Sequence, residues 1–337
     1  MRQIWITRPG APEVLEVRTA PDPDVGPGQV RIRVHAAGIN FADLMARVGL
    51  YPDAPKLPCV IGYEVSGTVD QVGAGVADCA PGDRVMAMPR FGGYTDTLVV
   101  SGEQVFRIPD SMTFEEAAAL PVVYLTAYTM MLFTGTVRPG STVLIHSAAG
   151  GVGLAAIQLA KTRGCTIIGL ASAGKHAFLR AQGVAHPLES TGDYAAAVRA
   201  IVGDKGVDLV LDPVGGKSFS TGYDLLGPCG RLVAFGLSAV ASGKTRSWLH
   251  AGAQVLKVKK FSPLKLMEDN KTVSGTNMGH LFGRLDLLKP QFAALLAMYQ
   301  AGEIKPHVDR TFRFDEAALA HHHLHDRKAI GKVLLVP

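Results

Sequence analysis

The stretch that decides the fold reads Thr142-Val-Leu-Ile-His146, Ser147-Ala-Ala-Gly-Gly-Val-Gly153, and continues to Lys175. Residues 142–146 are almost entirely apolar, which is typical of a parallel strand buried on both faces by helices. After the glycines come an apolar helical pattern over residues 154–161 and a second apolar run over residues 166–170. This order predicts one βαβ unit, with its glycines at the turn from strand to helix.

The chemistry of this turn favours a bound diphosphate. Residues without a Cβ let the backbone turn tightly and approach phosphate oxygens, and Gly153 lets the helix pack close to the strand. The N–H groups and the dipole at the start of a helix attract an anion. The spacing is Ala-x-Gly-x-x-Gly, with Ala148 where the usual dinucleotide fingerprint has glycine. We therefore predict dinucleotide binding by Ala149, Gly150, Gly151, Val152 and Gly153; the alternative is a tight turn with only a structural role.

The end of the second strand indicates which dinucleotide binds. Sites that prefer NAD usually place a carboxylate about 20 positions after the glycines. Here the sequence is Ala171-Ser172-Ala173-Gly174-Lys175, with one cation and no acid. A hydroxyl and an ammonium suit a 2′-phosphate, so we predict NADPH, with Ser172 and Lys175 as contacts. Alternatively, Lys175 is an ordinary solvated lysine.

Length and composition restrict the class of protein. The chain has 337 residues, enough for two domains, and its 47% hydrophobic and 19% charged content is typical of a globular protein. A net charge of +5 gives no reason to expect nucleic-acid binding. The four cysteines are scattered, which favours a reducing compartment such as the cytoplasm and neither a metal site nor a disulfide framework.

No targeting segment is predicted. The N-terminus lacks the apolar core of a signal peptide. Residues 117–137 carry no charge, but Pro121, Gly135 and several polar side chains interrupt them. Either a membrane span or a buried helix that crosses between domains would have this composition.

The first third of the chain is predicted to be β-rich. Residues 1–35 alternate apolar and polar between turn-forming segments, and further strands are expected at residues 60–69, 83–88 and 94–100. A capping box, Thr113-Phe-Glu-Glu116, opens a helix.

From about residue 123 strands alternate with helices, and strands at residues 207–212, 230–236 and 271–274 complete a doubly wound parallel sheet. A helix (291–302), a strand (311–314), an acid-started helix (315–327) and a strand (331–336) follow.

Several motifs together carry a family resemblance. They are Gly38-Ile-Asn40-Phe-Ala-Asp43, Arg47-Val-Gly49-Leu-Tyr51-Pro52, Gly62-Tyr-Glu-Val-Ser-Gly67, Pro81-Gly-Asp-Arg-Val85, Tyr124-Leu-Thr126-Ala-Tyr128, Ala148-Ala-Gly-Gly-Val-Gly153 and Gly331-Lys-Val-Leu-Leu-Val-Pro337. The chain resembles the medium-chain dehydrogenase/reductase superfamily in its zinc-free quinone oxidoreductase (zeta-crystallin) branch. Within it, residues 40–47, 186–187 and 304–307 look most like the vesicle-amine-transport-protein subfamily, which has been linked to membranes and lipid.

This resemblance implies an α/β fold of two domains. A GroES-like β-rich catalytic domain would comprise residues 1–122 and 277–337, and a Rossmann domain that binds NADP(H) would comprise residues 123–276. The active-site cleft would lie between them, and the protein would be a homodimer.

The residues themselves argue against zinc. A catalytic zinc needs three protein ligands. Zinc-dependent relatives take a histidine from a Gly-His-Glu triplet, which here reads Gly62-Tyr63-Glu64, and no cysteine stands near Asn40. We therefore predict no metal, and hydride transfer from NADPH to an electrophile that needs no Lewis acid: a quinone or an α,β-unsaturated carbonyl.

The resemblance assigns three residues to the catalytic cleft. Asn40 would hydrogen-bond the nicotinamide ribose or the acceptor oxygen, unless it only caps a turn. Tyr51 would donate a hydrogen bond or a proton to the acceptor, unless it is a packed aromatic at the base of a loop. Asp43 could equally be an acid that starts a helix and orients its neighbours.

The remaining cofactor contacts also follow from the resemblance: Thr126, Ser190, Phe235, Gly236, Val273, Gly275 and Lys332. Lys332 would contact a phosphate or ribose, unless it is a surface lysine. Ser190 stands near the position where many relatives carry a tyrosine against the 2′-phosphate, which weakens the expected preference for NADPH.

Two features allow other interpretations. His321, His322, His323 and His325 fall on a predicted surface helix, where we expect no specific metal site. Residues 244–271 hold seven cations against two acids. This cation run is either a solvated surface or a patch that makes weak contact with anionic lipid. The alternative function is accordingly an NADPH-binding lipid or membrane adaptor.

Overall fold

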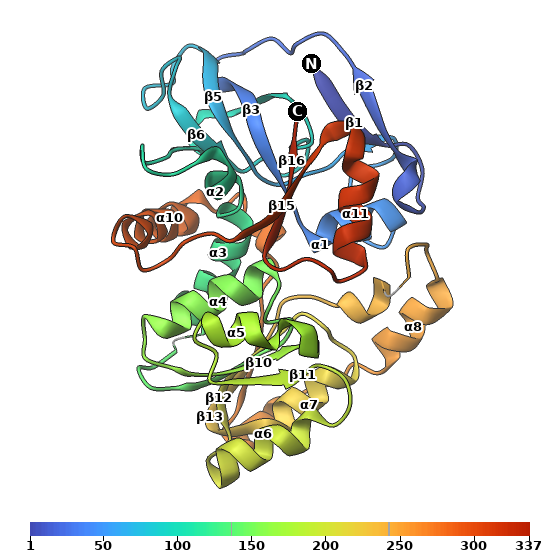
Figure 1. The fold of residues 1–337 in the computed structure, drawn as a ribbon, viewed down its shortest axis with the longest axis vertical. Coiled ribbons are helices and arrows are strands. Elements are labelled where there is room, and N and C mark those ends of the chain that lie inside the picture. The colour runs from blue at the N-terminus through green and yellow to red at the C-terminus, as the bar shows by residue number, and fades with distance from the viewer. Residues whose placement is uncertain (136, 242) are drawn as a thin grey trace. The chain divides into compact units, whose positions relative to one another are not determined.

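The computed structural model describes residues 1–135, 137–241 and 243–337. The chain forms two compact units (Figure 1). Unit 1 comprises Met1–Leu125, Gly243–Arg246 and Gly279–Pro337, and unit 2 comprises Thr126–Ser242 and Ser247–Met278. The sequence placed the first boundary at residues 122 and 123 and assigned residues 243–246 to the nucleotide domain, whereas the structure groups these four residues with unit 1.

Unit 1 is built on antiparallel strands. A seven-stranded sheet has the order β15-β16-β3-β5-β6-β8, with β7 also paired to β3, and a smaller sheet has the order β2-β1-β4. Figure 1 shows strands from both ends of the chain meeting here, because β16 pairs antiparallel with β3. The strands are β1 (Arg2–Ile6), β2 (Leu15–Thr19), β3 (Gln29–Ile39), β4 (Cys59–Val60), β5 (Val65–Val72), β6 (Arg84–Ala87), β7 (Thr97–Ser101), β8 (Val105–Arg107), β15 (Val308–Arg313) and β16 (Lys332–Val336).

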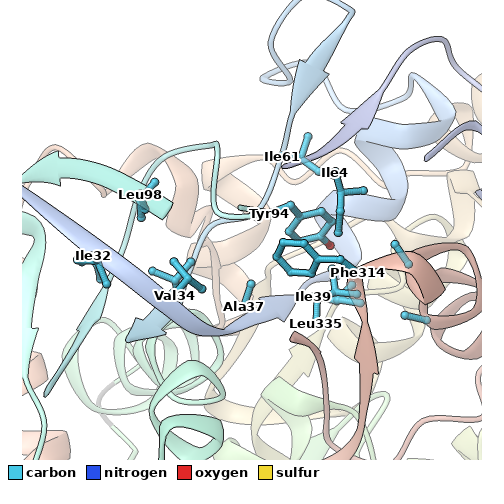
Figure 2. Close-up of a cluster of buried hydrophobic side chains, with 14 of the residues drawn as sticks. Ile4, Ile32, Val34, Ala37, Ile39, Ile61, Tyr94, Leu98, Phe314 and Leu335 are labelled. Carbon is cyan, nitrogen blue, oxygen red and sulfur yellow. The ribbon is translucent and has the colours of Figure 1, made fainter. Parts of the chain in front are cut away.

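The core of unit 1 follows from the two-residue period of its strands. Along β3, Val30, Ile32 and Val34 are buried, while the side chains between them face outward. All three belong to one cluster with Tyr94 and Phe314, and Figure 2 labels Ile32 and Val34 in it. The helices of this unit are α1 (Phe41–Val48), α2 (Phe114–Ala118), α10 (Leu285–Gln300) and α11 (Ala317–His325), and α3 (Pro121–Tyr128) runs from unit 1 into unit 2.

Unit 2 contains a six-stranded, all-parallel sheet with the order β11-β10-β9-β12-β13-β14. The order reverses between β9 and β12, so this is the predicted doubly wound fold. The strands are β9 (Thr142–Ile145), β10 (Thr166–Ala171), β11 (His186–Glu189), β12 (Val207–Asp212), β13 (Leu226–Ala234) and β14 (Thr272–Gly275). The helices are α4 (Gly151–Lys161), α5 (His176–Ala181), α6 (Tyr194–Val202), α7 (Lys217–Leu225), α8 (Trp248–Leu256) and α9 (Pro263–Asp269).

Several elements differ from the sequence-based prediction. The predicted strand 60–69 is interrupted at Gly62, whose φ of +101° breaks the strand where a Cβ would meet the ring of Tyr94. Strand β11, which begins with His186 and Pro187, was not predicted. Helix α10 begins at Leu285, ahead of Pro290, so this proline lies within a helix that was predicted to start after it.

The uncharged stretch 117–137 contributes to three short elements: α2, α3 and a π-helical turn, Thr129–Phe133. Thr136 lies outside the described residues. Among the residues that are described, no helix is long and apolar enough to cross a membrane.

Candidate functional site

The glycine-rich turn lies at the carboxyl end of β9, where the strand order of unit 2 reverses. Gly150 is the N-cap of α4, and no side chain in the described part of the chain caps this helix. Two conditions for binding an anion are therefore met, since the turn is at the topological switch point and its helix N-terminus is left to a ligand.

Gly150 and Gly153 are needed for different reasons. A Cβ on Gly153 would lie 2.5 Å from the backbone oxygens of both Ser147 and Ala148, so the packing of the turn itself excludes any side chain. Among the described residues, a Cβ on Gly150 would have one neighbour within 4 Å, the Ser147 oxygen at 3.3 Å. The protein's own packing thus leaves room at Gly150, where a dinucleotide needs the backbone to be bare.

A carboxylate lies beside the predicted 2′-phosphate contacts. Ser172 follows β10, and Lys175 ends the short 3₁₀ helix Ala173–Lys175. Glu189, the last residue of β11, accepts hydrogen bonds from the backbone N–H groups of Ala173 (2.8 Å) and Ser190 (3.1 Å). Desolvation raises the pKa of Glu189, but hydrogen bonds from three N–H groups and a hydroxyl outweigh it, so the pKa is below its usual value.

The sequence-based prediction was therefore incomplete at this point. It looked for an acid only in the residues after β10, whereas the acid comes from the neighbouring strand β11, which pairs Glu189 with Ala171. The missed signal was an acid at the end of the next apolar segment, His186-Pro-Leu-Glu189.

The other predicted cofactor residues of unit 2 lie along the sheet. Phe235 and Gly236 directly follow β13, and the Phe235 N–H donates to the Asp212 oxygen at the end of β12 (3.1 Å). Val273 and Gly275 belong to β14, with Gly275 at its carboxyl end. Phe235, Gly236 and Gly275 thus share the sheet edge of the glycine turn. Thr126 is buried in α3.

In unit 1 a buried polar cluster surrounds Asn40. Its Nδ2 donates to Glu64 Oε1 (2.8 Å), and Lys332 Nζ donates to its Oδ1 (2.6 Å). Lys332 also forms an ion pair with Glu64, and Glu64 Oε2 accepts from the Val122 N–H (2.7 Å). The resemblance offered Lys332 as a phosphate or ribose contact or a surface lysine, whereas here its side chain is 4% exposed and paired with Glu64 and Asn40.

Asp43 is a fully buried acid in the first turn of α1. Its Oδ2 accepts from the Asn40 N–H (2.8 Å) and from the Tyr94 hydroxyl (3.1 Å). Its Oδ1 is buried and has no hydrogen-bond partner among the described residues. Burial raises the pKa of Asp43 to about 7, so this carboxyl can gain or lose a proton near neutral pH.

An aromatic cluster surrounds Tyr63, which is 4% exposed. The Tyr51 ring stands perpendicular to it at 6.4 Å between centroids, and the rings of Phe91 and Phe282 lie at 5.1 and 6.0 Å. The Tyr63 hydroxyl is buried; no described residue hydrogen-bonds it with normal geometry, and the Tyr51 side chain is a partner of poorer geometry. Burial raises the pKa of both tyrosines. Sequence reasoning considered position 63 only as a lost zinc ligand.

The histidines of α11 do not converge. His322 Nε2 contacts Glu13 (2.5 Å), and His323 Nε2 contacts Asp309 (2.6 Å). His321 is completely buried, with Nε2 3.3 Å from the Tyr94 hydroxyl. The prediction of a surface helix was wrong for this residue, because α11 packs against the core through Ala317 and Ala320. Within residues 1–135, 137–241 and 243–337, no group of three His, Cys, Asp or Glu is placed to hold a metal.

Comparisons with known proteins identify relatives of the whole chain. Residues 26–110 match the alcohol dehydrogenase GroES-like domain, and residues 182–335 match a zinc-binding dehydrogenase domain. The human synaptic vesicle membrane protein VAT-1 homolog is 44% identical over 325 residues, which are 96% of this chain and 82% of the relative.

Two solved structures are similar over the full length. The human VAT-1 homolog-like protein has a TM-score of 0.87 at 34% identity, covering 100% of this chain and 98% of that one. Escherichia coli quinone oxidoreductase complexed with NADPH has a TM-score of 0.88 at 29% identity, covering 100% of both chains. Together with the GroES-like and Rossmann units, these matches show that the chain belongs to the medium-chain dehydrogenase/reductase superfamily, close to the VAT-1 homologs and the quinone oxidoreductases.

Proposed function

We propose that this protein is an NADPH-dependent reductase that transfers hydride to a quinone or an α,β-unsaturated carbonyl without zinc. The observation that carries the proposal is the uncapped glycine-rich start of α4 at the switch point of a parallel sheet. Two structural relatives, the Escherichia coli quinone oxidoreductase and a mycobacterial protein, are described as complexed with NADPH.

The residues of unit 2 fit this coenzyme. The N–H groups at the start of α4 suit the diphosphate, and the bare backbone at Gly150 lets it approach. Ser172 and Lys175 provide a hydroxyl and an ammonium for the 2′-phosphate. Glu189 opposes a second negative charge there, so we propose that NADPH is preferred only modestly over NADH.

NADPH, when bound, supplies the hydride. The residues of unit 1 would then position the acceptor and handle the proton that the reduction consumes. Asp43 has the pKa for this proton transfer. Asn40 is held by Glu64 and Lys332, so we propose that it positions the backbone around Asp43 and does not itself swing toward a ligand. Tyr51, which is half-buried, would donate a hydrogen bond to the acceptor.

We propose that the protein holds no zinc because the side chains at this position are poor zinc ligands. Tyr63 occupies the place where zinc-dependent relatives have histidine, and a neutral buried phenol is a poor ligand for zinc. Metal analysis of the purified protein tests this directly: less than about 0.1 zinc per chain is expected, and one tightly held zinc per chain would contradict the proposal.

The activity is tested with an acceptor panel. Purified protein should oxidise NADPH in the presence of 1,2-naphthoquinone or trans-2-nonenal, followed as loss of NADPH absorbance. A Gly150→Ala variant, which we expect to fold but to bind the coenzyme poorly, is the matched control. A folded wild-type protein that turns over no acceptor in a broad panel would refute the proposal.

A second candidate, a lipid-associated adaptor of the same fold, rests on the surface of α8 and α9. Leu249 and Leu256 are 91% and 88% exposed, and Trp248 is 64% exposed. The cation run flanks them in the sequence, although Lys244, Lys259 and Lys265 have acidic partners. Apolar side chains beside lysines suit an anionic membrane surface.

Trp248 provides the test of this candidate. The chain has two tryptophans, so a Trp5→Phe variant leaves Trp248 as the only indole fluorophore. If the protein is a lipid-associated adaptor, the fluorescence emission of Trp248 should shift to the blue with phosphatidylserine vesicles and not with phosphatidylcholine vesicles. An unchanged spectrum at low and high salt would remove this candidate.

A further inference from the structure

We propose that Tyr63 donates the hydrogen bond that stabilises the acceptor's carbonyl oxygen during reduction, in the role that a Lewis-acid metal would otherwise play. This inference rests on the proposed reductase function and adds a residue and a chemical requirement to it: the acceptor must present a carbonyl oxygen to unit 1.

The first observation is the poorly paired hydroxyl of Tyr63. Buried hydroxyls are nearly always hydrogen-bonded, because leaving one without a partner costs free energy. The Tyr63 hydroxyl is buried and makes no hydrogen bond of normal geometry in the described part of the chain; the Tyr51 side chain is a partner of poorer geometry. A ligand oxygen that accepts a hydrogen bond from the Tyr63 hydroxyl would explain this arrangement.

The second observation is a buried carboxyl oxygen. Among the described residues, Asp43 Oδ1 has no hydrogen-bond partner. The negative charge of Asp43 and the neighbouring Tyr51 both contribute to raising the pKa of Tyr63, after burial itself, so these groups lie within electrostatic range of one another. The phenol therefore stays protonated and is a donor at all physiological pH values.

The surroundings set the class of ligand. The rings of Tyr51, Phe91 and Phe282 around Tyr63 form an apolar wall. A conjugated, largely apolar acceptor suits this wall, with one carbonyl oxygen directed at the phenol. In such an apolar setting a fixed donor stabilises developing charge far better than in water.

The chemistry balances with the coenzyme and one proton. Hydride adds to the β-carbon of the enone and forms a C–H bond, while the C=C π electrons shift and negative charge collects on the carbonyl oxygen. That oxygen accepts the Tyr63 hydrogen bond. A proton, from Asp43 or from water, then completes the reduced product, and the coenzyme leaves oxidised.

The test compares Tyr63→Phe with Tyr299→Phe. The first removes only the hydroxyl and keeps the packed ring, whereas the second removes a hydroxyl that donates to Glu116 (2.8 Å), elsewhere in unit 1. With trans-2-nonenal we expect Tyr63→Phe to lower kcat about 100-fold. Its NADPH dissociation constant should stay within about twofold of wild type, because only the acceptor is affected. Tyr299→Phe should keep wild-type kcat.

Stability separates a ligand donor from a structural one. If the Tyr63 hydroxyl is only weakly paired in the free protein, Tyr63→Phe should melt at or above the wild-type temperature, while Tyr299→Phe should melt lower. A kcat for Tyr63→Phe within twofold of wild type, or a loss of kcat that comes with a lowered melting temperature, would overturn the inference. Replacing Tyr63 by 3-fluorotyrosine keeps a donor and should preserve kcat; a 100-fold loss there would also overturn it.

The two proposals fail in different ways. A wild-type protein without any turnover would defeat the reductase function and this inference with it. An active wild type with an equally active Tyr63→Phe variant would defeat only the role of Tyr63.

Discussion

Alanine substitutions at Gly150 and Gly153 should separate coenzyme binding from folding. At Gly153 the new Cβ would stand 2.5 Å from two backbone oxygens, which cannot move aside as a flexible side chain could. Such overpacking costs about 1–3 kcal/mol, which lowers the melting temperature by several degrees in a protein of this size. NADPH binding should be lost as well, because the turn is distorted.

At Gly150 the expected result is different. The backbone there is extended (φ −82°, ψ 172°) and suits alanine, and the Cβ would meet only the Ser147 oxygen at 3.3 Å. Stability should therefore change by less than about 1 kcal/mol. The Cβ would occupy space that the diphosphate needs, and the loss of one or two charge-assisted hydrogen bonds, about 1.5–3 kcal/mol, corresponds to a roughly 10- to 100-fold weaker NADPH affinity.

The assay pairs thermal unfolding with calorimetric titration of NADPH. Gly252→Ala in α8, where a Cβ would meet nothing within 4 Å, is the control for a glycine-to-alanine change outside the turn. If Gly150→Ala binds NADPH as tightly as wild type, the diphosphate does not lie against this turn. If instead Gly150→Ala unfolds as readily as Gly153→Ala, the reasoning from Cβ contacts is wrong.

Three further substitutions test charged groups. Lys175→Glu should weaken NADPH binding about tenfold or more and leave the NADH affinity nearly unchanged. Glu189→Gln should tighten NADPH binding. Equal effects on both coenzymes in titrations would refute the assignment of the 2′-phosphate site. Lys332→Met should destabilise the protein by about 3–5 kcal/mol in urea unfolding, because Glu64 would remain buried without its ammonium; a loss below about 1 kcal/mol would contradict this. The folded pKa of Asp43, about 7, lies above its ordinary value of 3.8, so ionisation of this carboxyl lowers the free energy of unfolding as pH rises from about 4 to 7. Asp43→Asn should abolish that part of the pH dependence of unfolding. An unchanged unfolding profile would show that burial does not raise this pKa.

Local sequence patterns predicted five of the six strands of the nucleotide unit and the helix after its glycines. The apolar runs of β9 and β12 and the glycines before α4 are signals that lie within one short segment each. A buried parallel strand cannot be polar on either face, so its composition alone identifies it. The carboxyl ends of such strands then bring Gly150 and Phe235 to one edge without any further information.

The side-chain network of unit 1 could not be predicted in this way. Asn40, Glu64 and Lys332 come together from three distant segments, and only the pairing of β16 with β3 brings Lys332 to them. The sequence also does not show which polar residues are buried. A lysine near the C-terminus and a histidine on an amphipathic-looking helix are usually solvated, yet Lys332 and His321 are buried.

The most direct test of the account is a calorimetric titration of the wild-type protein with NADPH and with NADH, followed by turnover of trans-2-nonenal by the same preparation. The account predicts saturable binding of NADPH, modestly tighter than that of NADH, and acceptor-dependent oxidation of the bound coenzyme. A folded protein that gives no heat with either nucleotide would contradict it.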